Sequence, residues 1–232
     1  GPVWVKYKSS VQSGYMCQVF ALYTNMERAA KMGFRPLEYA LQLSDIFDKK
    51  IFVNADLIRP VRSAEEIVRN YNAGYMSALK YVEEGAVYEG KIENLKLFYN
   101  KGVRMSTLTW NYVNDLAYPN PPAAENGGRV IYRYDREHGL TNIGKEFVQA
   151  MEEMGIVIDL SHLNDCGGGW RILYCKSRTP VIASHSNARG LCGTARNLSD
   201  SMIRLIGEHG GVAGINFCGM KVQMKIGSMT VR

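Results

Sequence analysis

The chain has 232 residues, of which 46% are hydrophobic and 22% charged, as expected of a globular protein with one large core. Its net charge is +6, but Lys and Arg are interleaved with Asp and Glu, so the sequence contains no basic stripe typical of nucleic-acid binding. No apolar run reaches the roughly 18 residues of a membrane-spanning helix, so we expect neither nucleic acid nor a membrane as a partner.

Cysteine usage indicates a reducing compartment. An odd number of cysteines, none in a C-x-x-C pair, favours buried thiols over disulfides or a cysteine metal site. The first ten residues also contain no hydrophobic signal region. We therefore expect a cytoplasmic protein. The cysteines are Cys17, Cys166, Cys175, Cys192 and Cys218.

Strands and helices are predicted in alternation along the first half of the chain. Apolar, β-branched and aromatic runs predict a weak strand over residues 3–7 and stronger strands over 15–24, 76–82 and 103–110. Helical spacing of apolar residues predicts helices over 37–52, 64–72 and 93–100. Ser63 and Glu66 resemble a capping box at the start of the second helix. Residues 27–30 are predicted as a polar connection and 117–129 as a surface loop.

The alternation continues in the second half. Helices are predicted over residues 142–154, 170–177 and 198–209, and strands over 156–160, 181–183 and 212–217. Six convincing strands separated by helices predict an α/β fold with a parallel sheet. A closed (β/α)₈ TIM barrel has eight strands and about 250 residues. We therefore expect one domain over residues 1–232, either an incomplete TIM barrel or an open doubly wound sheet.

A repeated pattern marks the candidate site. Two short apolar runs each lead to a Ser-His pair, Ser161-His162 and Ser184-His185. Polar residues at the carboxyl ends of parallel strands are where α/β enzymes carry their chemistry. Glu83 ends a third predicted strand, and imidazole with carboxylate is a ligand set that suits zinc. Glu84 follows directly, so the residues alone do not choose between the two acids. For an acidic pair before glycine, a solvated strand end is the interpretation that the residues alone favour.

Three further charged residues lie close to the histidines in the sequence. Asp159 sits inside an apolar run and needs a partner there, either to support His162 or as a structural hydrogen-bond acceptor. Arg189 and Arg196 follow His185, and either guanidinium could fork onto a substrate carboxylate. For Arg189, an ordinary surface position without contact to substrate is favoured.

Several long segments together resemble the membrane (renal) dipeptidase family of zinc metallopeptidases, particularly its soluble bacterial branch. The resemblance rests on VEEGAVYEGKIENLKLFYNKGVR, TLTWNYVNDLAYPN, GLTNIGKEFVQAMEEMGIVIDLSHL, PVIASHSNAR, RNLSD and GGVAGINF. It implies a (β/α)₈ barrel with two zinc ions at the strand ends and hydrolysis of dipeptides, including some with a D-residue at the carboxyl end.

Carried onto this chain, the resemblance implies that Glu83, not Glu84, bridges the metals and that His162 and His185 bind the second one. It also implies that Arg196 contacts substrate. The family has a substrate-binding histidine on its fourth strand, where this chain has Trp110, which puts substrate choice in doubt because an indole offers one donor and no acceptor.

Two elements of the family pattern are missing from this sequence. There is no H-x-D motif, which the family carries on its first strand, and no counterpart of the eighth-strand Asp that handles the proton of the nucleophilic water. The segment SMTV resembles the start of the helix that leads to that strand. We therefore expect an internal segment lacking strands one and eight, one zinc or none, and impaired dipeptide hydrolysis. Exposed strand edges would favour a homodimer.

Two other functions fit the same residues. One is a hydrolase of the amidohydrolase type that acts on a cyclic amide, since such barrels also use His and Asp at strand ends. The other is a non-catalytic, metal-free binding or structural protein that retains the barrel segments.

Overall fold

The computed structural model describes residues 7–126, 129–165, 179–217, 225–226 and 229–230. The chain divides into two compact units, one made of residues 1–83 and 87–105 and the other of residues 84–86 and 106–232. The single domain expected over residues 1–232 stays a prediction.

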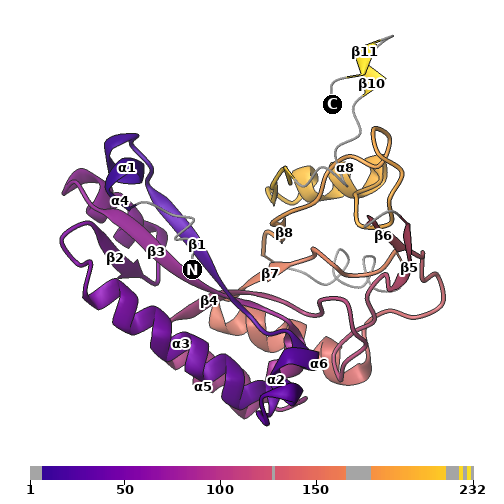
Figure 1. Cartoon of the computed structure of the whole chain (residues 1–232), viewed down its shortest axis with the longest axis horizontal. Coiled ribbons are helices and arrows are strands. Elements are labelled where there is room, and N and C mark those ends of the chain that lie inside the picture. The colour runs from indigo at the N-terminus through magenta and orange to yellow at the C-terminus, as the bar shows by residue number, and fades with distance from the viewer. Residues whose placement is uncertain (1–6, 127–128, 166–178, 218–224, 227–228, 231–232) are drawn as a thin grey trace. The chain divides into compact units, whose positions relative to one another are not determined.

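The first unit is built on the parallel pairing of two strands with β3. β1 pairs with β3 from Cys17 opposite Ser77 to Tyr23 opposite Glu83, and β2 pairs with it from Ile58 opposite Met76. The long helix α3 contacts all three strands (Figure 1). The strands of this unit are β1 (Cys17–Tyr23), β2 (Ile58–Val61) and β3 (Met76–Glu83), and its helices are α1 (Tyr7–Gln12), α2 (Met26–Lys31), α3 (Pro36–Phe52), α4 (Ala64–Asn72) and α5 (Ile92–Asn100).

A buried lysine ties α3 to β3. Lys80, only 4% exposed, donates from Nζ to Ser44 Oγ at 3.0 Å, Asp48 Oδ2 at 2.8 Å and the Lys101 carbonyl at 2.8 Å. These three bonds use all three of its N–H donors. Burial nevertheless lowers the pKa of Lys80, because it disfavours the charged form.

The second unit contains most of the remaining elements. The two short segments that cross between the units are η1 (Gly85–Tyr88) and β4 (Val103–Thr107). The second unit holds β5 (Pro122–Asn126), β6 (Arg129–Tyr132), α6 (Asn142–Met154), β7 (Val157–Asp159), β8 (Ile182–Ala183), α8 (Asp200–Glu208), β9 (Val212–Ala213), β10 (Lys225–Ile226) and β11 (Met229–Thr230). Large side chains buried here include Leu116, Phe147 and Ile158.

Helix α6 has defined ends that place the strand after it. Thr141 Oγ1 accepts from the Gly144 amide at 2.9 Å and so caps the helix. Gly155, at φ 71°, ends it in the left-handed conformation that glycine adopts easily. The chain then enters β7, which leads to the first Ser-His pair.

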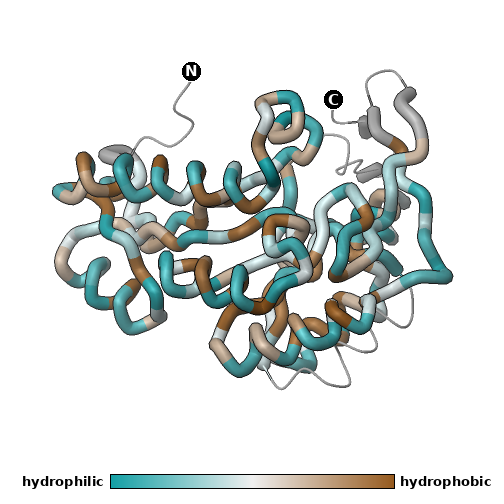
Figure 2. The backbone as a smooth tube through the Cα atoms, turned by 90° about the horizontal axis from the view of Figure 1, so that it is seen from below, coloured by the Kyte–Doolittle hydropathy of each residue, from teal (hydrophilic) through white to brown (hydrophobic). Residues whose placement is uncertain are grey.

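The strand order confirms the predicted alternation of strands and helices. The path β1-β3-β4-β7-β8-β9 follows the order of the chain, with β2 pairing beside it on β3. The pairs β7–β8 and β8–β9 are parallel, like those around β3. Hydrophobic and hydrophilic residues alternate along the helices, as amphipathic helices covering a sheet require (Figure 2).

Some sequence predictions were wrong. Residues 27–30 lie in helix α2 instead of a polar connection, because Asn25 Oδ1 accepts from the Arg28 amide at 2.8 Å and caps it. The loop expected over 117–129 contains β5, which pairs antiparallel with β6. The Ser63–Glu66 box forms only in part: Ser63 Oγ accepts from the Glu66 amide, while the Glu66 carboxylate accepts from the Arg62 amide.

Strand lengths and chain ends also differ from expectation. The strands predicted over 103–110 and 212–217 end early, at Thr107 and Ala213. Near the end of the chain, β10 pairs antiparallel with β11, so Met229 and Thr230 of the SMTV segment lie in a strand and not in the expected helix start. The other two residues of this segment lie outside the described part of the chain. The predicted strand over 3–7 lies outside the described residues up to residue 6, and Tyr7 begins α1. The predicted helix over 170–177 lies outside the described residues altogether.

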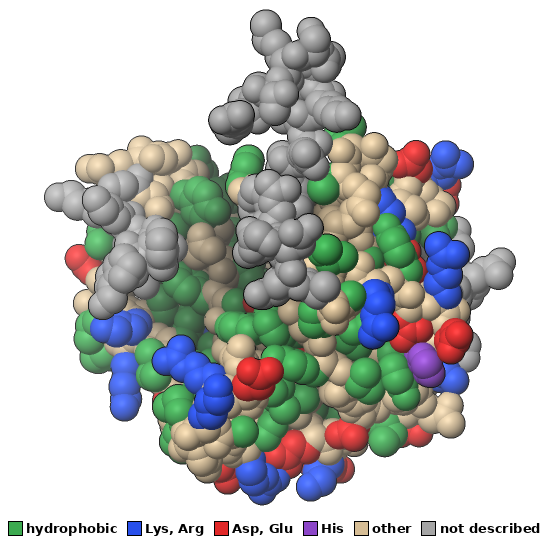
Figure 3. Space-filling view, turned by 45° about the vertical axis from the view of Figure 1, so that its right-hand side comes forward, with side chains coloured by type: hydrophobic (Ala, Val, Ile, Leu, Met, Phe, Trp, Pro, Cys, Tyr) green, Lys and Arg blue, Asp and Glu red, His purple; other side chains and the backbone are tan. Residues whose placement is uncertain are grey.

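Within the described part of the chain, every helix is too short or too polar to cross a lipid bilayer. On the face seen in Figure 3, Lys and Arg side chains are interspersed with Asp and Glu.

Candidate metal centre

The two Ser-His pairs lie together at the carboxyl ends of neighbouring strands. Asp159, the last residue of β7, stands opposite Ile182 of β8. β8 leads directly into Ser184-His185, and Leu160 alone separates β7 from Ser161-His162. His162 adopts a left-handed backbone conformation, with φ 76°, which costs a non-glycine residue of order 1–3 kcal/mol. This turn brings the His162 and His185 rings to a centroid separation of 4.9 Å.

The hydrogen bonds of the two rings define where their protons lie. His162 Nδ1 lies 3.0 Å from the carbonyl oxygen of the Asn111 side chain, an acceptor, so Nδ1 carries the proton. His185 Nδ1 lies 2.7 Å from Ser184 Oγ, whose own proton is directed to Asp159. Each Nε2 is therefore left with a lone pair.

The two Nε2 atoms face each other at 2.8 Å. Two lone pairs at this distance repel unless a positive centre lies between or beside them. The Arg196 guanidinium supplies part of this positive charge, since its Nη2 donates to His185 Nε2 at 3.3 Å. The pair of imidazoles is thus arranged as an acceptor site for a cation.

Glu83 completes a cluster of potential metal ligands. One ligand atom from each of Glu83, His162 and His185 lies within 4.8 Å of the others. Glu83 is the last residue of β3, and its peptide bond joins it to Glu84, the first residue of the second unit.

Glu84 has a different environment from Glu83. It is fully buried, and its Oε1 accepts from the Ala86 amide at 2.8 Å and from Asn114 Nδ2 at 2.8 Å. Its backbone is also strained, with φ 120°. Burial raises the pKa of its carboxyl group, because Oε2 is enclosed without a hydrogen-bond partner.

Asp159 links the two Ser-His turns. The residue is 1% exposed, and its Oδ1 accepts from the amides of Ser161 and Ser184, both at 2.9 Å. Its Oδ2 accepts from the Ser184 hydroxyl. The sequence left two roles open for Asp159, support of His162 or structural hydrogen bonding. The carboxylate acts as a structural hydrogen-bond acceptor, and through the Ser184 hydroxyl it connects to His185.

The expected substrate residues lie beside the histidines. Arg196 is buried, at 4% exposure, and contacts His185 as described above. The Trp110 ring lies 5.7 Å from the His162 ring, at an interplanar angle of 40°. Tyr112 packs on the indole, also at 5.7 Å.

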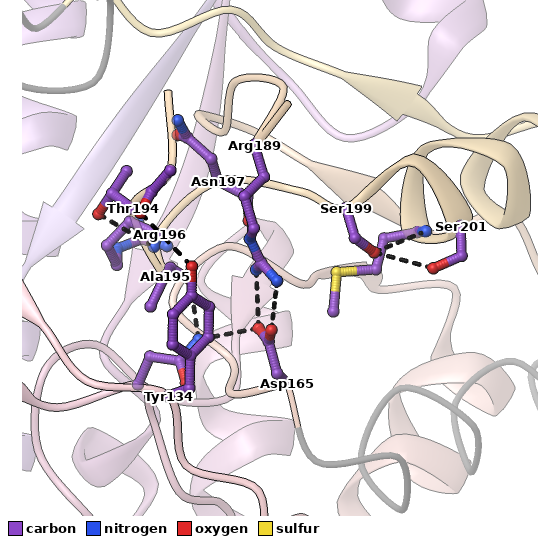
Figure 4. Close-up of polar contacts among 12 residues, drawn as sticks. Tyr134, Asp165, Arg189, Thr194, Ala195, Arg196, Asn197, Ser199 and Ser201 are labelled. Carbon is purple, nitrogen blue, oxygen red and sulfur yellow. Dashed lines mark hydrogen bonds and ion pairs between the residues drawn. The ribbon is translucent and has the colours of Figure 1, made fainter. Parts of the chain in front are cut away.

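Arg189 is held by other groups. It forms a two-pronged ion pair with Asp165, in which Nη2 lies 2.9 Å from Oδ1, and its Nε donates to the Asn197 carbonyl at 2.9 Å (Figure 4). Its side chain, 18% exposed, therefore ties two loops together, whereas the sequence favoured an ordinary surface arginine.

Sequence reasoning missed several supporting residues. Asn111, Asn114 and Ser184 hold His162, Glu84 and His185 respectively. Ser184 is part of the repeated Ser-His pattern, so its repetition was a usable signal. Nothing in the local sequence of Asn111 or Asn114 indicated these partners, which lie 51 and 30 residues away.

Comparison with known proteins identifies the family. Residues 5–231 match the sequence profile of the membrane dipeptidase family, peptidase family M19. The chain belongs to this family. Dipeptidase 3 of Mus musculus is 33% identical over 165 residues, which are 68% of this chain and 32% of the relative. An uncharacterized protein in the pqqA 5′ region of Klebsiella pneumoniae is 29% identical over 188 residues, 78% of this chain and 64% of the relative. The chain thus spans less than two thirds of the length of either relative.

Two solved metallopeptidase structures share the fold. Dipeptidase AC matches with a TM-score of 0.77 at 23% identity, over 93% of this chain and 63% of that one. A metallopeptidase from Rhodobacter sphaeroides, bound to a phosphinate mimic of the dipeptide L-Ala-D-Ala, matches with a TM-score of 0.75 at 22% identity. The match covers 91% of this chain and 64% of that one. The predicted α/β fold, an incomplete TIM-like barrel, is confirmed by these matches and the strand order.

Proposed function

We propose that this chain carries a metal site of a zinc-dependent dipeptidase, with Glu83, His162 and His185 as ligands. The observation that supports this most directly is the convergence of one carboxylate and two imidazole nitrogens within 4.8 Å. Membership of the M19 family supports dipeptides as the substrate class.

The donor set fits zinc. Zinc binds imidazole nitrogen and carboxylate oxygen at about 2.0–2.2 Å, which puts ligand atoms of a tetrahedral ion about 3.3–3.5 Å apart. The two Nε2 atoms lie 2.8 Å apart, so the rings must separate by about 0.5 Å to bind one ion, and all three ligand atoms lie within 4.8 Å of one another. Both imidazoles also have their Nδ1 atoms engaged by neighbouring oxygens, the usual support of a metal-binding histidine.

Zinc bound by these groups would supply Lewis acidity, polarising a scissile carbonyl and lowering the pKa of a bound water. In the proposed mechanism the protein's own residues bind and orient the dipeptide. The Arg196 guanidinium, buried beside His185, binds a carboxylate or carbonyl of the substrate. Trp110, packed on His162, provides an apolar wall with one N–H donor.

The 232 residues contain neither an H-x-D motif nor a carboxylate that we can assign to proton transfer. We therefore propose that this chain alone binds one zinc ion weakly and turns over dipeptides slowly or not at all. Turnover of dipeptides at about 1–10³ s⁻¹, the typical range of kcat for enzymes, would contradict this part of the proposal.

Zinc titration of the purified chain tests the ligand assignment. We expect one zinc ion per chain by calorimetry and elemental analysis, and loss of binding in Glu83→Gln, His162→Ala and His185→Ala. His138→Ala is the matched control, because His138 is half exposed and pairs with Asp135. Loss of zinc in the control, or its retention in all three ligand variants, would overturn the assignment.

Substrate panels test the reaction class. Dipeptides with L- or D-residues at the carboxyl end are compared with cyclic amides, with a chelator-treated sample as the blank. Slow zinc-dependent release of amino acids from dipeptides alone is the expected result. Hydrolysis of a cyclic amide would support the amidohydrolase alternative.

A further inference from the structure

A chain of polar contacts runs from a buried carboxylate to the metal-facing nitrogen of His185. The Asp159 carboxylate is fixed in orientation, because its Oδ1 accepts from two backbone amides, Ser161 and Ser184, each at 2.9 Å. Its Oδ2 faces the Ser184 hydroxyl, which in turn lies 2.7 Å from His185 Nδ1. All of these groups are in the second unit.

The direction of these hydrogen bonds follows from the donors available. A hydroxyl has one proton, and the Asp159 carboxylate is its strongest nearby acceptor. Ser161 Oγ, the other acceptor within reach, lies farther away at 3.4 Å and already accepts from the His185 amide. Ser184 Oγ therefore presents a lone pair to His185, which must donate from Nδ1 and keep Nε2 unprotonated.

The geometry points to Asp159 as a positioning residue that sets the tautomer of His185 through the Ser184 hydroxyl, and thereby the metal affinity of the site. This inference deepens the proposed function and rests on it for its metal-binding consequence. The tautomer itself is a property of the metal-free chain. It can be measured whether or not the chain binds zinc.

Asp159→Asn is the informative substitution, because it reverses the relay. The two amide donors hold the remaining oxygen of the Asn side chain in the Oδ1 position, so its NH₂ group takes the Oδ2 position and donates to Ser184 Oγ. The Ser184 proton then turns to His185 Nδ1. His185 becomes protonated at Nε2, where it can no longer ligate a metal.

Ser184→Ala has a weaker effect, because it removes the relay without reversing it. His185 then populates both tautomers, and part of the population still offers an Nε2 lone pair. In the double variant Asp159→Asn/Ser184→Ala there is no hydroxyl to pass on the wrong proton. The double variant should therefore bind metal better than Asp159→Asn alone.

The experiment combines ¹⁵N chemical shifts of the His185 ring in the metal-free chain with zinc titration of the same samples. We expect an Nδ1–H ring in the wild type, Nε2–H in Asp159→Asn, and a mixture in Ser184→Ala and the double variant. Zinc affinity should fall about 100-fold in Asp159→Asn but only about 10-fold in the other two, the range typical of groups that support metal ligands. Circular dichroism establishes that each variant is folded.

Ser186→Ala is the control, since Ser186 is a neighbouring buried serine that contacts Ser161 Oγ at 3.4 Å but lies outside the relay. Its tautomer and affinity should match the wild type. An Nδ1–H ring in Asp159→Asn, or a double variant no better than that single variant, would overturn the inference. A wild-type chain with the expected tautomer but no zinc binding would refute the proposed function and leave the relay established.

Discussion

Two glycines in helices should respond in opposite ways to the same substitution. Gly144 lies in the first turn of α6, and a Cβ atom added there would meet the Leu116 carbonyl oxygen at 1.9 Å. Gly207 lies near the end of α8, where an added Cβ meets nothing within 4 Å. Alanine at each position therefore compares steric overlap with helix propensity alone.

The expected magnitude for Gly144→Ala follows from the overlap. Close C···O contacts in proteins lie at about 3.3 Å, so α6 or the Leu116 backbone must move by roughly 1.4 Å. That shift is about one residue of helix rise and would break the cap made by Thr141, costing about 1 kcal/mol. Overpacking adds a further cost of about 1–3 kcal/mol. Replacing glycine by alanine in a helix gains at most about 1 kcal/mol in helix propensity, which offsets only part of this cost.

We therefore expect Gly144→Ala to lower the free energy of unfolding by about 1–3 kcal/mol and Gly207→Ala to raise it by about 0.5–1 kcal/mol. In a protein of this size the first change corresponds to a Tm lowered by roughly 2–12 °C. Urea titration and thermal melts followed by circular dichroism measure both. If Gly144→Ala were as stable as the wild type, the close approach of α6 to Leu116 would be refuted.

Three further predictions concern groups outside the metal centre. Burial lowers the pKa of Lys80 below its usual 10.5, so unfolding takes up a proton at any pH between the folded and unfolded pKa values. The free energy of unfolding, measured by urea titration, should therefore rise with pH in that window. Lys80→Met should remove this rise. Burial raises the pKa of Cys17 to about 11, so at pH 8 iodoacetamide should modify it roughly 200-fold more slowly than a model thiol of pKa 8.5, as followed by peptide mass spectrometry. Arg189→Lys cannot form the fork onto Asp165 and should lower the unfolding free energy by about 1–3 kcal/mol, whereas an unchanged value would mean that the fork contributes nothing.

Local sequence patterns predicted the elements whose stability is largely local. Helix α6 was found because its apolar residues repeat at helical spacing between Thr141 and Gly155, which cap it. Helix α2 was missed because six residues are too few to show a period, and its start depends on the Asn25 side chain. The antiparallel β5–β6 pair was missed because β5 contains Pro122, Ala and Asn, which local propensity assigns to loops.

Some residues of the candidate site could likewise be predicted from local sequence patterns, and others could not. His162 and His185 could be proposed from the residues alone, because each follows a buried apolar run and the pattern occurs twice. The choice between Glu83 and Glu84 could not, since the two acids are adjacent and their different surroundings arise from Ala86, Thr107 and Asn114. The contacts with Thr107 and Asn114, 23 and 30 residues away, have no signature in the local sequence.

The two Ser-His turns hold each other through their backbones. The Ser161 and Ser184 amides donate to the same Asp159 oxygen, and the His185 amide donates to Ser161 Oγ at 3.1 Å. Opening either turn to solvent must break bonds that also anchor the other. In deuterated water, these three amide protons should therefore exchange at rates that report one common opening free energy, as members of a single cooperative unit.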